Sequence, residues 1–127
     1  MNVLVIGGNL FIGRLLVAEL SDLHFDKRTE FVAFLRGNIH FEDGSLLHFR
    51  ELVDVEFSLQ KVAYSYHYQH TDGEVLFRYD NAPHFPNLST APHHKHVGSE
   101  TNVVAANPPT LATVLHEVEV IMRANLP

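Results

Sequence analysis

The sequence contains no cysteine, and its apolar runs are too short to cross a membrane as helices. Without cysteine the protein has no disulfide, no thiolate nucleophile and no Cys-ligated zinc, and the cytoplasm is the expected compartment. Runs such as Val3–Ile6 are far shorter than the ~18 residues of a transmembrane helix. This run has no basic segment before it and no small-residue cleavage site after it, so we expect neither a signal peptide nor membrane binding.

Basic residues are also few. The chain has nine lysines and arginines and fifteen aspartates and glutamates, which gives a formal charge of −6. Proteins that hold nucleic acid by bulk electrostatics are usually basic, so this balance argues against a long nucleic-acid groove. It leaves room for a local phosphate site.

The chain length predicts a single domain over residues 1–127. Residues 30–124 form its expected core, and residues 1–23 form an atypical strand, turn and helix. The fold class that we predict is α+β: a four-stranded antiparallel meander with an N-terminal strand and helix, and a C-terminal helix packed on the sheet.

Two Asp-Gly pairs mark the hairpins of this meander, at residues 43–44 and 72–73. The strands are expected at about residues 31–41, 46–53, 61–69 and 74–80. On the third of them Tyr64, Tyr66 and Tyr68 share one face, which predicts a core position, while His67 and Gln69 share the other.

The C-terminal helix is expected to start after Asn107, as its N-cap, with Pro108 in its first turn. Its apolar residues follow i, i+3, i+4, i+7 spacing, which predicts one stripe against the sheet. These residues are Leu111, Val114, Leu115, Val118, Ile121 and Met122.

The first twenty residues, MNVLVIGGNLFIGRLLVAEL, resemble the start of an NAD-dependent epimerase. The match consists of a hydrophobic strand, Gly7, Gly8 and Gly13, and an expected helix after them. However, Leu10 replaces the middle glycine of the extended fingerprint, and no second strand with a ribose-reading residue follows. We therefore predict a strand, turn and helix without a bound dinucleotide.

Histidine is over-represented, with ten in the chain, and four of them lie between His84 and His96. In extended chain His94 and His96 point the same way. Arg78 and Asp80 share a face of the fourth strand, opposite His67 on the third. These side chains could line one concave site.

Metal-free cleavage of RNA is one chemistry that suits this set of residues. One histidine would take the 2′-hydroxyl proton and another would protonate the leaving 5′ oxygen, since imidazole titrates near neutrality. Asp80 would orient an imidazole, and Arg78 or Lys95 would hold the phosphate.

A divalent metal held by His94 and His96 with His84 or Asp80 is the second chemistry, because imidazole and carboxylate bind zinc or manganese. In the third reading the histidines are solvated, Arg78 pairs with Asp80, and Asp80 and Asn81 make turn hydrogen bonds. The residues alone leave all three open.

Residues of about 31–122 resemble the TumE-type toxins of type II toxin–antitoxin modules. The resemblance rests on FLRG (34–37), FEDGS (41–45), YSYHYQ (64–69), FRYDNAPH (77–84), PHHKHVG (92–98) and PTL (109–111). It implies a small cytoplasmic toxin, proposed to be a ribonuclease, that a DNA-binding helix-turn-helix antitoxin neutralises. The epimerase-like start departs from the family pattern.

We therefore expect a ribonuclease toxin with RNA as substrate and no cofactor, and with a divalent metal as the option. A non-catalytic protein-binding or metal-binding module is the alternative, and a homodimer is left open. The candidate catalytic residues are His94, His96, His84, His67 and Asp80, and the candidate substrate-binding residues are Arg78, Lys95, Asn81 and Tyr79.

Overall fold

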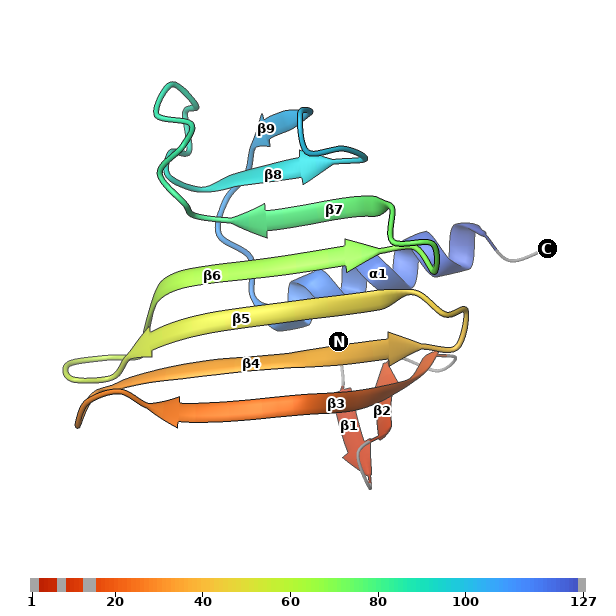
Figure 1. Cartoon of the computed structure of the whole chain (residues 1–127), viewed down its shortest axis with the longest axis horizontal. Helices are drawn as coiled ribbons and strands as arrows, with labels where there is room; N and C mark the ends of the chain where they lie inside the picture. The colour runs from red at the N-terminus through yellow and green to blue at the C-terminus, as the bar shows by residue number, and fades with distance from the viewer. Residues whose placement is uncertain (1–2, 7–8, 13–15, 126–127) are drawn as a thin grey trace.

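The computed structural model describes residues 3–6, 9–12 and 16–125, and shows one antiparallel sheet with a helix across one of its faces (Figure 1). Nine strands in this part of the chain follow one another in the sheet in chain order, and seven of them, β3 to β9, form its body. The elements are β1 Val3–Ile6, β2 Asn9–Ile12, β3 Leu16–Lys27, β4 Val32–Phe41, β5 Leu46–Asp54, β6 Gln60–Gln69, β7 Val75–Asp80, β8 His94–Val97, β9 Val103–Ala105 and α1 Leu111–Ala124.

The α+β class and the meander are confirmed, but the sheet has more strands than the four that were predicted. The four expected strands are β4 to β7, and Gly44 and Gly73 adopt the positive φ that their turns require. Residues 94–97, which lie outside the four expected strands, form β8, which pairs with β7. This pairing covers a strand edge that would otherwise be exposed.

The predicted N-terminal helix is wrong. Leu16–Lys27 is strand β3, paired antiparallel with β4, although Leu16 and Leu20 are four residues apart, which is a helical spacing. Helix propensity is weak, and pairing with the free edge of β4 overrides it. The expected glycine turn at residues 7, 8 and 13 lies outside the described residues, and no helix follows it to bind a pyrophosphate over residues 16–27.

The core lies between the sheet and α1. The three tyrosines expected in the core, Tyr64, Tyr66 and Tyr68, are buried. They form one cluster with the helix stripe that includes Val114 and Val118. In the described part of the chain, no helix has both the length and the apolar character that spanning a bilayer requires.

The helix starts three residues later than predicted. Thr110, not Asn107, is its N-cap, because the Thr110 side chain accepts the Thr113 backbone N–H at 3.1 Å and the two threonines form a reciprocal capping box. Pro108 therefore precedes the helix instead of standing in its first turn.

Because side chains alternate along strands, the face of the sheet away from α1 carries a different set. We call this the open face. It includes Arg36 on β4, His48 and Arg50 on β5, and His67 on β6, as the cross-strand pairs Arg36↔Arg50 and His48↔His67 show. No helix of the described residues packs on it (Figure 1).

Candidate active site

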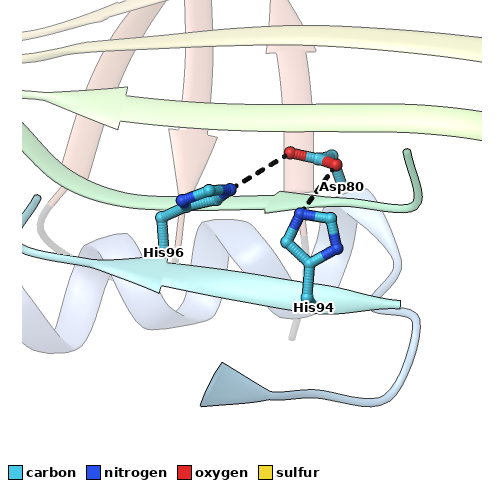
Figure 2. A group of neighbouring side chains, drawn as sticks. All are labelled: Asp80, His94 and His96. Atoms are coloured by element: carbon cyan, nitrogen blue, oxygen red, sulfur yellow. Dashed lines mark ion pairs between the residues drawn. The ribbon is translucent and has the colours of Figure 1, made fainter. Parts of the chain in front are cut away.

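Asp80, His94 and His96 meet on the open face, where β7 and β8 run side by side (Figure 2). In the ladder Asp80 is opposite His94, and Arg78 is opposite His96. The even-numbered positions of both strands thus bring a carboxylate, a guanidinium and two imidazoles together. All three residues in Figure 2 are buried.

His94 has an oxygen acceptor beside each ring nitrogen. Its Nδ1 lies 2.9 Å from the Pro92 carbonyl oxygen, and its Nε2 lies 2.9 Å from Asp80 Oδ1. Only a ring with a hydrogen on both nitrogens donates to both acceptors at once. An acceptor beside each ring nitrogen of His94 is the arrangement that suits a proton donor.

His96 has an acceptor on one side and a donor on the other. Its Nδ1 lies 2.9 Å from the Glu100 backbone oxygen, whereas Arg78 Nη2 donates to Nε2 at 3.0 Å. Because a guanidinium has no acceptor, Nε2 must offer its lone pair, and the neutral ring satisfies both contacts. The two imidazoles thus have complementary partners: His94 has two acceptors, and His96 has an acceptor and a donor.

Asp80 and Arg78 connect the two rings. Arg78 Nε donates to Asp80 Oδ2 at 3.0 Å, and Asp80 Oδ1 also accepts the Ala82 backbone N–H at 3.0 Å. The other end of Arg78 pairs with Glu100 at 3.0 Å. This network fixes the rings and keeps a cation beside them.

Phe85 covers the imidazoles. Its ring centroid lies 4.8 Å from that of His94 and 5.8 Å from that of His96, both edge to face. The side chain of Arg78, in contrast, is 27% exposed. Solvent therefore reaches the cluster at the guanidinium, while Phe85 shields the rings.

The cluster also has the make-up of a metal site. One ligand atom from each of Asp80, His94 and His96 lies within 4.8 Å of the others. Both histidines direct Nδ1 at a backbone carbonyl and Nε2 toward Asp80, an orientation common among metal ligands. The Arg78 guanidinium argues against a metal here, because it already donates to His96 Nε2 and to Asp80, where a metal ion would bind.

The remaining candidate histidines lie apart from the cluster. His84 is exposed in the turn after β7, and within the described residues no hydrogen bond or ion pair joins it to His94 or His96. His67 is half-buried on β6, directly opposite Arg78. Burial, and then the Arg78 charge, lower the pKa of His67.

The other predicted substrate-binding residues do not face the cluster. Lys95 and Tyr79 point to the helix side, where Lys95 Nζ lies 2.7 Å from Glu117 and the Tyr79 hydroxyl donates to the same carboxylate at 2.6 Å. Asn81 braces two strands, since its side chain accepts from Tyr64 N and donates to Val62 O. Each has a structural partner of its own.

Three residues near the site escaped sequence reasoning: Phe85, Glu100 and Arg50. Nothing in the sequence indicates that Phe85 covers the rings or that Glu100 reaches Arg78. Arg50 could have been found, because the hairpin at residues 43–44 sets a register that places it opposite Arg36.

Comparisons with known proteins point in one direction. No curated protein and no solved structure matches the chain. One family model, described as Toxin TumE, matches residues 12–126 and so spans nearly all of the sheet and the helix. The chain therefore belongs to the TumE toxin family.

Proposed function

We propose that this TumE toxin is a ribonuclease that cleaves RNA by histidine acid–base chemistry without a metal. The observation that carries the proposal is the pair of buried imidazoles with complementary hydrogen-bond partners beside an arginine. Such a pair meets both proton requirements of RNA transesterification, and the guanidinium meets the charge requirement.

In the proposed reaction His96 Nε2 takes the proton of a 2′-hydroxyl, and the resulting oxyanion attacks the adjacent phosphorus. The bond from phosphorus to the 5′ oxygen breaks, and that oxygen takes a proton from His94. The products are a 2′,3′-cyclic phosphate and a 5′-hydroxyl end. Arg78 stabilises the charge on the phosphorane, and Asp80 orients both rings.

This mechanism also requires that the RNA reach the two imidazole rings. The rings of His94 and His96 are only 1% and 3% exposed in their side chains, beneath Phe85. The substrate must therefore displace Phe85 and replace Arg78 as the partner of His96 Nε2. We assign that step to RNA binding.

Membership in this family implies a cognate antitoxin. We propose a helix-turn-helix, DNA-binding protein in that role and the cytoplasm as the place of action. The lack of cysteine supports the compartment, since a reduced environment removes the need for disulfides.

Metal binding is the second candidate, and the close approach of the Asp80, His94 and His96 ligand atoms favours it. Titration of the purified protein with Mn²⁺ or Zn²⁺ by calorimetry tests this candidate. A one-to-one site that is lost in His96→Ala would support it, whereas heat of dilution alone would remove it.

Expression of the chain without an antitoxin tests the proposed function. We expect growth arrest from the wild type and none from soluble, folded His94→Ala or Arg78→Ala. His116→Ala serves as the matched control, because His116 is exposed on α1, and it should still arrest growth. Normal growth with soluble wild-type protein would instead favour a non-catalytic binding module.

A further inference from the structure

Two arginines face each other on the open face with no acid between them. Arg36 on β4 is the direct cross-strand partner of Arg50 on β5, and both are exposed. Neither takes part in an ion pair within the described residues. Like charges directly opposite destabilise a sheet, so this pair suits an external anion better than it suits folding.

The neighbouring positions lead from this arginine pair to the active site without adding a negative charge. His48 and His67 are cross-strand partners on β5 and β6, and His67 is in turn opposite Arg78. Burial, and then Arg50, lower the pKa of His48. Along β4 to β6 the open-face positions from residues 34–40, 46–52 and 63–69 include no carboxylate. The sheet thus separates charges that are mixed in the sequence.

Hollows adjoin both arginines. Arg36 lines one of about 240 Å³, together with His24 and His48. Asp22, also in its lining, is engaged with Asn38. Arg50 lines a second hollow of about 440 Å³, together with apolar Phe34, Leu52 and Ala63 and polar Ser65. Glu51, also in its lining, accepts the Tyr66 hydroxyl at 3.0 Å.

The second hollow indicates whether the open face suits a single-stranded or a double-stranded nucleic acid. It sets an apolar wall and an aromatic ring beside a guanidinium, and the β6 residue Ser65 in its lining is the partner of Asp80. An unstacked nucleobase needs an apolar surface of this kind, and its phosphate needs the cation. Bases in a duplex are stacked and cannot enter such a hollow.

We propose that the open face binds the phosphates of single-stranded RNA along Arg36, Arg50 and Arg78 and leads the strand to the Asp80–His94–His96 cluster. The three arginines span β4 to β7, about 14 Å at ~4.8 Å per interstrand step. This inference rests on the proposed ribonuclease function and adds the surface that selects the substrate.

Binding of a fluorescent twelve-nucleotide RNA with 2′-O-methyl groups, measured by anisotropy, tests the proposal, because this probe cannot be cleaved through its 2′ oxygen. The double variant Arg36→Gln/Arg50→Gln should bind at least roughly tenfold more weakly at 50 mM salt. The slope of log K against log salt should fall by about 1.4, or about 0.7 for each lost phosphate contact on a single strand.

The matched control is Lys27→Gln/Arg123→Gln, which removes the same charge away from the open face. Lys27 pairs with Ala33 on the helix-facing register, and Arg123 lies on α1. This control should keep the wild-type affinity and slope. The arginine variant should also keep its melting temperature or gain a little, since it loses only a repulsive pair.

Failure of this inference is separable from failure of the proposed function. If the wild type cleaves unmodified RNA while the arginine variant binds the probe with unchanged affinity and slope, the open face is refuted and the ribonuclease stands. If the wild type binds the probe, loses binding with the arginines and never cleaves RNA, the binding face stands and the ribonuclease fails. Absence of any wild-type binding at 50 mM salt also refutes the open face.

Discussion

Asp80→Asn is the change that most directly probes the network at the active site. The carboxylate accepts hydrogen bonds from Arg78, His94 and the Ala82 backbone, and its side chain is only 12% exposed. An amide of nearly the same size keeps one acceptor oxygen but replaces the other with a donor. That NH₂ group would face the donor of either Arg78 or His94.

The expected cost follows from these contacts. A hydrogen bond to a charged group contributes about 1.5–3 kcal/mol, and breaking a buried ion pair by removal of one partner costs about 3–5 kcal/mol. We therefore expect Asp80→Asn to lower the free energy of unfolding by about 3–5 kcal/mol. That loss is a large part of the roughly 5–15 kcal/mol that stabilises a domain, so the variant should be folded but fragile.

Urea denaturation at pH 7, followed by circular dichroism, measures this difference without adding salt. Asp72→Asn is the control, because it makes the same substitution in an exposed hairpin turn where Asp72 accepts only the Glu74 backbone N–H. The control should stay within about 0.5 kcal/mol of the wild type. An equally small effect of Asp80→Asn would refute the claim that Asp80 holds the network together.

Three further results are expected. Burial and Arg78 lower the pKa of His67 from 6.5, so the unfolded chain binds a proton at this histidine more readily than the folded protein does. The free energy of unfolding should therefore fall as pH drops below about 6.5. His67→Gln should flatten this dependence in urea titrations at several pH values. Phe85→Ala should uncover the imidazoles and speed their modification by diethyl pyrocarbonate, read by mass spectrometry, and an unchanged rate would show that Phe85 does not shield them. Lys95→Met should cost about 1–2 kcal/mol in urea denaturation, because it removes the Glu117 ion pair and a cation–π contact with Tyr79, and a value near zero would count against both contacts.

Local turn chemistry explains which parts of the fold could be predicted. The Asp-Gly pairs before Ser45 and Glu74 are strong local signals for hairpins between alternating apolar runs, so β4 to β7 could be predicted from the sequence. The segment Leu16–Lys27 could not, because its helical spacing yields to the edge of β4, a tertiary effect. The polar β8 also carries no strand signal, and its pairing with β7 is non-local.

The part of the candidate site that depends on the alternation of side chains along a strand could be predicted. Alternation places Asp80 with Arg78, and His94 with His96, and only the pairing of β7 with β8 was needed to bring the two sets together. The same alternation sends Lys95 to the helix side, where Glu117 binds it. The placement of Arg78 on the same face as Arg36 and Arg50 depends on register across β4 to β7, which charge counting along the chain cannot reveal.

The ends of the RNA products test the central claim most directly. Purified toxin, incubated with RNA and a chelator, should produce 2′,3′-cyclic phosphate and 5′-hydroxyl ends, detected by mass spectrometry. Folded His94→Ala and His96→Ala should produce neither. Cleavage by both variants at the wild-type rate, or products with 5′-phosphate ends that form only with added metal, would contradict the acid–base centre.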